Sequence, residues 1–154
     1  MLEEWLVDGF NLLHHLTSRL NQKNKLSKES LFNLLANFSA SSDGRHVIVV
    51  LDGIGSDQEL EPFYTASFQA FYSQKVSADT CIERYLYEKK TAMRLMVVTK
   101  DRAIATMARG YGAGVVSPDA FMEMLRENKS ENSDILFKQK VKSRGFHRPF
   151  EDKI

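Results

Sequence analysis

The feature that most constrains the fold is the run His46–Leu51, which is apolar at every position after its histidine. A strand with one solvated face alternates apolar and polar residues. This run is apolar on both faces, which is typical of a strand in the middle of a parallel sheet. Parallel strands must be joined by long crossovers, usually helices. The run therefore predicts an α/β fold.

The rest of the chain alternates between short apolar runs and stretches with helical periodicity. We expect strands at 5–7, 46–51, 67–72, 95–99 and 115–116, and helices at 12–20, 31–38, 77–90, 104–108 and 117–125. Ser77 has the position of an N-cap and Gly110 that of a C-cap, and 53–62 is polar and rich in turn residues. Strands separated by helices predict a parallel sheet with right-handed crossovers and no second domain.

Charge and cysteine content narrow the class of protein. Lys plus Arg total 21 and Asp plus Glu 20, and this balance excludes a histone-like polycation and an acidic disordered tail. Cys81 is the only cysteine, so no internal disulfide can form and a reducing, cytoplasmic location is expected. Acids follow Met1 where a signal peptide carries cations, and no apolar run approaches the roughly 20 residues of a membrane helix. We therefore expect neither secretion nor a membrane location.

Cations are concentrated near the C-terminus. The segment 138–148 contains no acid and five cations, which are Lys138, Lys140, Lys142, Arg144 and Arg148. Such an arm can neutralise phosphates, and the nearby aromatic residues Phe146 and Phe150 can stack on unpaired bases. The alternative is a solvated tail. We expect a compact domain over 1–128 and a basic arm over 129–154, both parts of one single-domain protein.

Three of the predicted strands are followed by an aspartate: Asp8, Asp52 and Asp101. Ligands of an open parallel sheet bind outside the carboxyl ends of its strands, so these aspartates should lie along one edge. Asp79 begins the next helix near that edge, and Glu83 follows four residues later on the same helix face. Each aspartate alone could cap a turn or a helix. Their coincidence predicts an acidic site.

Four carboxylates close together would repel one another and would have raised pKa values unless a cation neutralised them. Oxygen ligands without a cysteine or histidine cluster favour a hard cation, so Mg²⁺ or Mn²⁺ is expected. The predicted ligands are Asp8, Asp52, Asp79 and Asp101.

Neighbouring residues could support this site. Gly9 would let the backbone turn sharply after the first strand. Asn11 could cap the following helix or hold a metal-bound water or a phosphate, and Arg102 could pair with Asp101 or contact a phosphate. Ser77 and Thr99 are candidates for hydroxyl groups that support the ligands from behind.

These residues, in this order, resemble the YacP-like group of the NYN domain, a branch of the PIN-like nuclease superfamily. The matching stretches are 6–11, 50–53, 77–83 and 97–102, within a resemblance over 4–126. It implies a PIN-like three-layer α/β/α sandwich and a metal-dependent endoribonuclease of RNA processing or decay. Some members are associated with ribosomes, so the ribosome is a candidate partner. The implied acidic site is Asp8, Asp52, Asp79 and Asp101, with Asn11 beside it.

Two positions depart from the family's pattern. Thr80 stands where a second acid often follows the helix aspartate, and Lys100 stands where a small polar residue is common. The missing acid leaves open whether one or two metal ions bind, and whether Glu83 compensates.

The expected reaction is hydrolysis of RNA phosphodiester bonds. Mg²⁺, held chiefly by Asp8, Asp79 and Asp101, would lower the pKa of a bound water, and Asp52 would orient a water or a second ion. The main alternative is an RNA-binding module without catalytic activity, which would bind RNA in EDTA and cleave none. A phosphatase commonly needs an Asp-x-Asp pair after the first strand, and this chain lacks one there.

Overall fold

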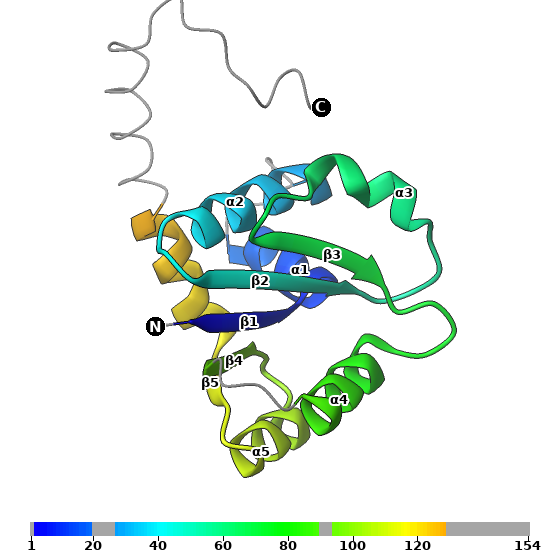
Figure 1. Cartoon of the computed structure of the whole chain (residues 1–154), viewed down its shortest axis with the longest axis vertical. Coiled ribbons are helices and arrows are strands. Elements are labelled where there is room, and N and C mark those ends of the chain that lie inside the picture. Colours follow the sequence, from blue (N-terminus) through cyan, green and yellow to red (C-terminus); the bar gives the residue numbers. More distant parts are fainter. Residues whose placement is uncertain (1, 20–26, 90–93, 129–154) are drawn as a thin grey trace, which may run out of the picture.

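The computed structural model describes residues 2–19, 27–89 and 94–128. Its five strands form one sheet in the order β3-β2-β1-β4-β5, and every pairing is parallel. The strands are β1 (Glu3–Asp8), β2 (Arg45–Leu51), β3 (Phe68–Tyr72), β4 (Arg94–Val98) and β5 (Gly114–Val116). Figure 1 shows helices on both sides of this sheet. The predicted α/β/α architecture is confirmed.

The helices are α1 (Gly9–Arg19), α2 (Lys28–Ala40), α3 (Asp57–Leu60), η1 (Glu61–Phe63), α4 (Ala78–Glu88) and α5 (Arg102–Gly110), and residues 118–128 are also helical. The segment 53–62, expected to be a loop, contains α3 and the start of the 3₁₀ helix η1. Ser56 explains this difference, because its side chain caps α3 by accepting the backbone N–H of Gln58. No helix in the described part of the chain is long and apolar enough to cross a bilayer.

Apolar side chains on both faces of the sheet form two cores. Trp5, Val7 and Leu51 pack with residues of α1, α2 and the helix at 118–128. Leu6 and Val50 point to the other face and pack with residues of α4 and α5. This alternation within β1 and β2 explains why both strands are apolar throughout.

The strand order fixes where a ligand can bind. The chain moves outward from β1 through β2 to β3, and then returns to β4 on the other side of β1. In open parallel sheets the ligand crevice lies at such a reversal, outside the carboxyl ends of the strands. Asp8 ends β1 and is paired in register with Val50, so Asp52 follows on the neighbouring strand at the same edge.

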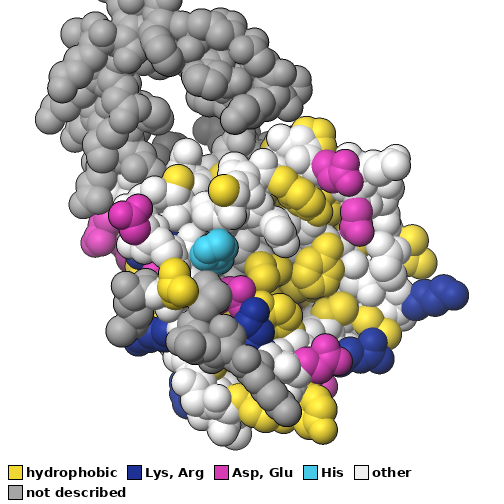
Figure 2. All heavy atoms as spheres, in the orientation of Figure 1, with side chains coloured by type: hydrophobic (Ala, Val, Ile, Leu, Met, Phe, Trp, Pro, Cys, Tyr) yellow, Lys and Arg dark blue, Asp and Glu magenta, His cyan; other side chains and the backbone are white. Residues whose placement is uncertain are grey.

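Charged side chains of both signs are interspersed on the face of the molecule shown in Figure 2.

Two glycines have different roles from those predicted. A Cβ on Gly9 would lie 2.6 Å from side-chain atoms of both Leu51 and Val49, so Gly9 allows close packing of α1 on β2 rather than a turn. Gly110 is the last residue of α5, and its prediction as the C-cap is wrong. Gly112 has the positive φ of 86° that ends the helix, and its N–H donates to the carbonyl of Arg109.

Candidate active site

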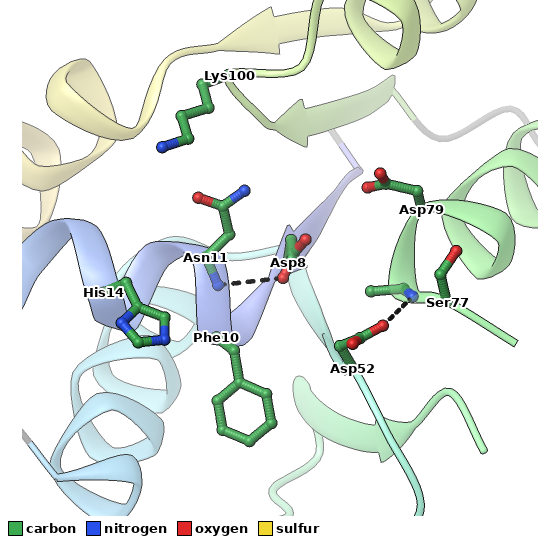
Figure 3. Close-up of a pocket in the computed structure, with 9 residues that line it drawn as sticks. Asp8, Phe10, Asn11, His14, Asp52, Ser77, Asp79 and Lys100 are labelled. Atoms are coloured by element: carbon green, nitrogen blue, oxygen red, sulfur yellow. Dashed lines mark hydrogen bonds between the residues drawn. The ribbon is translucent and has the colours of Figure 1, made fainter. Parts of the chain in front are cut away.

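An open cleft of about 730 Å³ lies at the carboxyl edge of the sheet. Its lining residues are Asp8, Phe10, Asn11, His14, Asp52, Ser77, Ala78, Asp79 and Lys100. They come from the end of β1, the start of α1, the end of β2, the start of α4 and the loop before α5. Figure 3 shows Asp8 between Asn11 on one side and Asp79 and Asp52 on the other. Of the four predicted carboxylates, Asp8, Asp52 and Asp79 line this cleft and Asp101 does not.

Asp8 both caps a helix and faces the cleft. The backbone N–H of Asn11 donates to Asp8 Oδ1 at 3.2 Å, so Asp8 rather than Asn11 caps α1. Burial raises the pKa of Asp8, and the charges of Asp79 and Asp52 raise it further, against the opposing effect of the Asn11 hydrogen bond. The Asn11 side chain lines the cleft.

Asp52 links the end of β2 to the start of α4. It is exposed, and its Oδ1 accepts the backbone N–H of Ala78 at 2.8 Å. Ser77 is the predicted N-cap of α4 and accepts the N–H of Thr80 at 3.1 Å. The Thr80 hydroxyl lies 2.9 Å from the Ser77 hydroxyl, so it belongs to this cap.

Asp79 is the carboxylate on which the charges of three other acidic residues act. Burial raises its pKa, and the charges of Asp101, Glu83 and Asp52 raise it further. Glu83 lies one turn further along α4 and does not line the cleft. Neighbouring carboxylates therefore act on both Asp8 and Asp79.

Asp101 is the N-cap of α5, and its Oδ1 accepts the N–H of Ile104 at 3.0 Å. Its own N–H donates to Thr99 Oγ1 at 3.0 Å, so Thr99 contacts the backbone of Asp101. Thr99 follows β4 instead of ending it. Arg102 is the first residue of α5, is exposed, and makes no ion pair with Asp101 or any other described residue.

The strand-end aspartates use only one oxygen in these caps. Within residues 2–19, 27–89 and 94–128, Oδ2 of Asp8, Asp52 and Asp101 receives no hydrogen bond. The same residues contain no group of three His, Cys, Asp or Glu side chains that could hold a metal ion as placed. The donors nevertheless fit a hard divalent cation in their chemistry, because the carboxylates of Asp8, Asp52 and Asp79 line one cleft.

Sequence reasoning missed four residues of the cleft, which are Phe10, His14, Ala78 and Lys100. The spacing of Asn11 and His14 places both on one face of α1 and could have identified His14. The five cations of the segment 138–148, which were predicted to bind RNA, lie outside the described residues.

Comparisons with known proteins agree with this architecture. The YacP-like NYN domain family matches residues 5–154. The structure of Rae1 (YacP) from Bacillus subtilis superposes with a TM-score of 0.73 at 18% identity, covering 94% of this chain and 85% of that one. A tryptophan-to-leucine mutant of Rae1 gives 0.67 at 20% identity, covering 93% and 86%. No protein with a curated description matches significantly.

These identities are low enough that the two structures support the fold alone. The family match extends over nearly the whole sequence, and the parallel sheet with an acidic carboxyl edge agrees with it. This chain therefore belongs to the YacP-like NYN domain family, whose fold is that of PIN-like nucleases.

Proposed function

We propose that this chain is a metal-dependent endoribonuclease that hydrolyses phosphodiester bonds in RNA processing or decay. The observation that carries the proposal is the convergence of carboxylates at one open cleft, where the pKa values of Asp8 and Asp79 are raised by burial and by neighbouring charges. Family membership supports it, because NYN domains are generally nucleases.

Asp8, Asp52, Asp79 and Asp101 are the residues that would hold Mg²⁺ or Mn²⁺. When bound, such an ion lowers the pKa of a water and stabilises negative charge on the phosphate that is attacked. Helix capping fixes three of these side chains, since one carboxylate oxygen of each accepts a backbone N–H. Thr99 fixes the backbone of Asp101, and Ser77 fixes the start of α4 next to Asp79.

Asn11 would act on the substrate side of the cleft. Its backbone is held by Asp8, while its side chain, a hydrogen-bond donor and acceptor, lines the cavity and can orient a phosphate oxygen or a water. Glu83 would act indirectly, through its charge on Asp79.

Contacts with the RNA backbone outside the cleft are assigned to Arg102 and to the C-terminal cations Lys138, Lys140, Lys142, Arg144 and Arg148. The division between a domain at 1–128 and an arm at 129–154 stays a prediction, as do a cytoplasmic location and the ribosome as a partner.

The test is cleavage of a pool of single-stranded and structured RNA with Mg²⁺ or Mn²⁺ and with EDTA. Asp8→Asn and Asp101→Asn should abolish metal-dependent cleavage. Asp43→Asn is the matched control, because Asp43 is exposed and precedes β2, at the opposite edge of the sheet. RNA binding in EDTA without any cleavage would instead support the alternative, an RNA-binding module that has no catalytic activity.

A further inference from the structure

Lys100 is a cation in an acidic cleft that pairs with none of the acids. It is exposed, lines the cleft with Asp8, Asp52 and Asp79, and makes no ion pair or hydrogen bond within the described residues. Several other cations of the domain do have an acidic partner, since Lys28, Arg45 and Lys89 lie 3.1, 2.7 and 3.0 Å from a glutamate oxygen. The ammonium group of Lys100 is therefore available for a ligand.

The backbone on either side of Lys100 is fixed. The N–H of Thr99 donates to the carbonyl of Val116 at 3.1 Å, and Thr99 itself is buried. Its hydroxyl accepts the N–H of Asp101, whose side chain caps α5. Hydrogen bonds to β5 and to the start of α5 thus fix the backbone on both sides of the lysine.

Figure 3 places Lys100 on the same side of the cleft as Asn11 and His14. Asp79 and Ser77 lie on the other side, with Asp8 between them. The cleft consequently has an acidic wall that ends at α4 and a wall of hydrogen-bond donors formed by Lys100, Asn11 and His14.

A nucleic acid needs such a wall because the acids would repel it. The carboxylates of Asp8, Asp52 and Asp79 line the cleft, and the charges of Asp101 and Glu83 act on Asp79. They outnumber the two positive charges of one divalent ion, so an approaching phosphate still meets net negative charge. An ammonium group offers three donors and a full positive charge to phosphate oxygens.

We propose that Lys100 binds a phosphate of the RNA substrate, and that Asn11 and His14 lie beside that phosphate. The next phosphodiester along the strand then faces the carboxylates. This inference rests on the proposed function, because it describes how the same cleft takes its substrate. A phosphate contact carries no sequence information, so its contribution is the same for RNAs of any sequence.

The test measures RNA binding separately from cleavage. Asp8→Asn serves as the background, and a fluorescein-labelled single-stranded RNA is titrated by anisotropy in EDTA at several salt concentrations. Lys100→Gln should reduce the slope of log K against log salt by about 0.7, the value for one phosphate contact in a single strand. Arg109→Gln removes the same charge from an exposed residue in the last turn of α5 and should leave the slope unchanged. Lys100→Arg should restore it.

Cleavage by the otherwise unaltered protein gives the second measurement. Lys100→Gln should raise KM by a larger factor than it lowers the rate of a single turnover at saturating RNA. Equal slopes and KM values for Lys100→Gln and Arg109→Gln would overturn the inference, whether or not the protein cleaves RNA. An absence of cleavage together with a smaller slope for Lys100→Gln would overturn the nuclease proposal and leave the phosphate contact in place.

Discussion

Asp8 combines two roles that substitutions can separate, a helix cap and a charge in the cleft. Asp8 Oδ1 accepts the N–H of Asn11 at 3.2 Å. Because asparagine caps a helix as well as aspartate does, Asp8→Asn keeps this acceptor and removes only the charge. Asp8→Ala removes both. We expect the alanine variant to be less stable than the asparagine variant by about 1 kcal/mol, the typical cost of losing an N-cap.

The effect of the charge depends on pH. Burial, with the charges of Asp79 and Asp52, raises the pKa of Asp8 above its ordinary value of 3.8. A carboxyl group whose pKa is raised by folding stabilises the folded state below its ordinary pKa, and this stabilisation is lost as pH rises through the raised value. At neutral pH without divalent cations, ionised Asp8 therefore opposes folding. Asp8→Asn should then unfold at a higher temperature than the wild type, and the difference should shrink as the pH approaches 3.8.

Thermal unfolding followed by circular dichroism tests both effects. For a domain of this size, 1 kcal/mol corresponds to about 2–4 °C in Tm, so the two variants should be resolved in EDTA at neutral pH. Mg²⁺ should raise the Tm of the wild type more than that of Asp8→Asn, because the ion binds the folded carboxylates. Equal Tm values for the Asn and Ala variants would refute the capping role. An Asn variant that is less stable than the wild type in EDTA would refute the conclusion that the charge opposes folding.

Two other parts of the structure give further predictions. Gly9→Ala should lower the free energy of unfolding, measured in urea, by about 1–3 kcal/mol, because the new Cβ would lie 2.6 Å from Leu51 and Val49. The control is Gly110→Ala, whose Cβ would meet no atom within 4 Å, and a similar loss of stability there would contradict this reasoning. Tyr85→Phe should lower the free energy of unfolding by about 1–3 kcal/mol, since the Tyr85 hydroxyl donates to the buried Glu4 carboxylate. Tyr87 is exposed, so Tyr87→Phe should leave the stability unchanged. Burial and the hydrogen bond to Glu4 raise the pKa of Tyr85 from 10.0 to about 12. The stability that the protonated Tyr85 hydroxyl contributes is therefore lost as pH rises from 10 to 12. Tyr85→Phe should not show this loss of stability at alkaline pH.

The sequence was sufficient to predict the sheet and its acidic edge for a simple geometric reason. Apolar residues on both faces of 46–51 required helices on both sides, and all parallel strands end at the same edge. Asp8, Asp52 and Asp101 therefore had to lie at that edge, and the strand order, with β2 and β4 on either side of β1, brings the ends of their strands close together. His14 and Lys100 were not predicted as cleft residues, because their positions depend on how α1 is seated on β2 and on where the loop after β4 is held. Both contacts join segments that are distant in the sequence.

Capping and ligand binding were treated as competing interpretations of each strand-end aspartate, yet the structure makes them compatible. In a strand-to-helix connection the strand ends where the next helix begins, so one carboxylate oxygen can accept a helix N–H while the other remains directed to the crevice. Asp52 shows why sequence alone could not settle this point. It accepts the N–H of Ala78, which begins α4 26 residues later and has Ser77 as its N-cap, whereas Ser56 caps the helix that follows β2. This long-range hydrogen bond joins the end of β2 to the start of α4, where the charge of Asp52 acts on Asp79. A capping bond at such an aspartate is therefore no argument against a catalytic role, and only the contrast between asparagine and alanine at the same position separates the two.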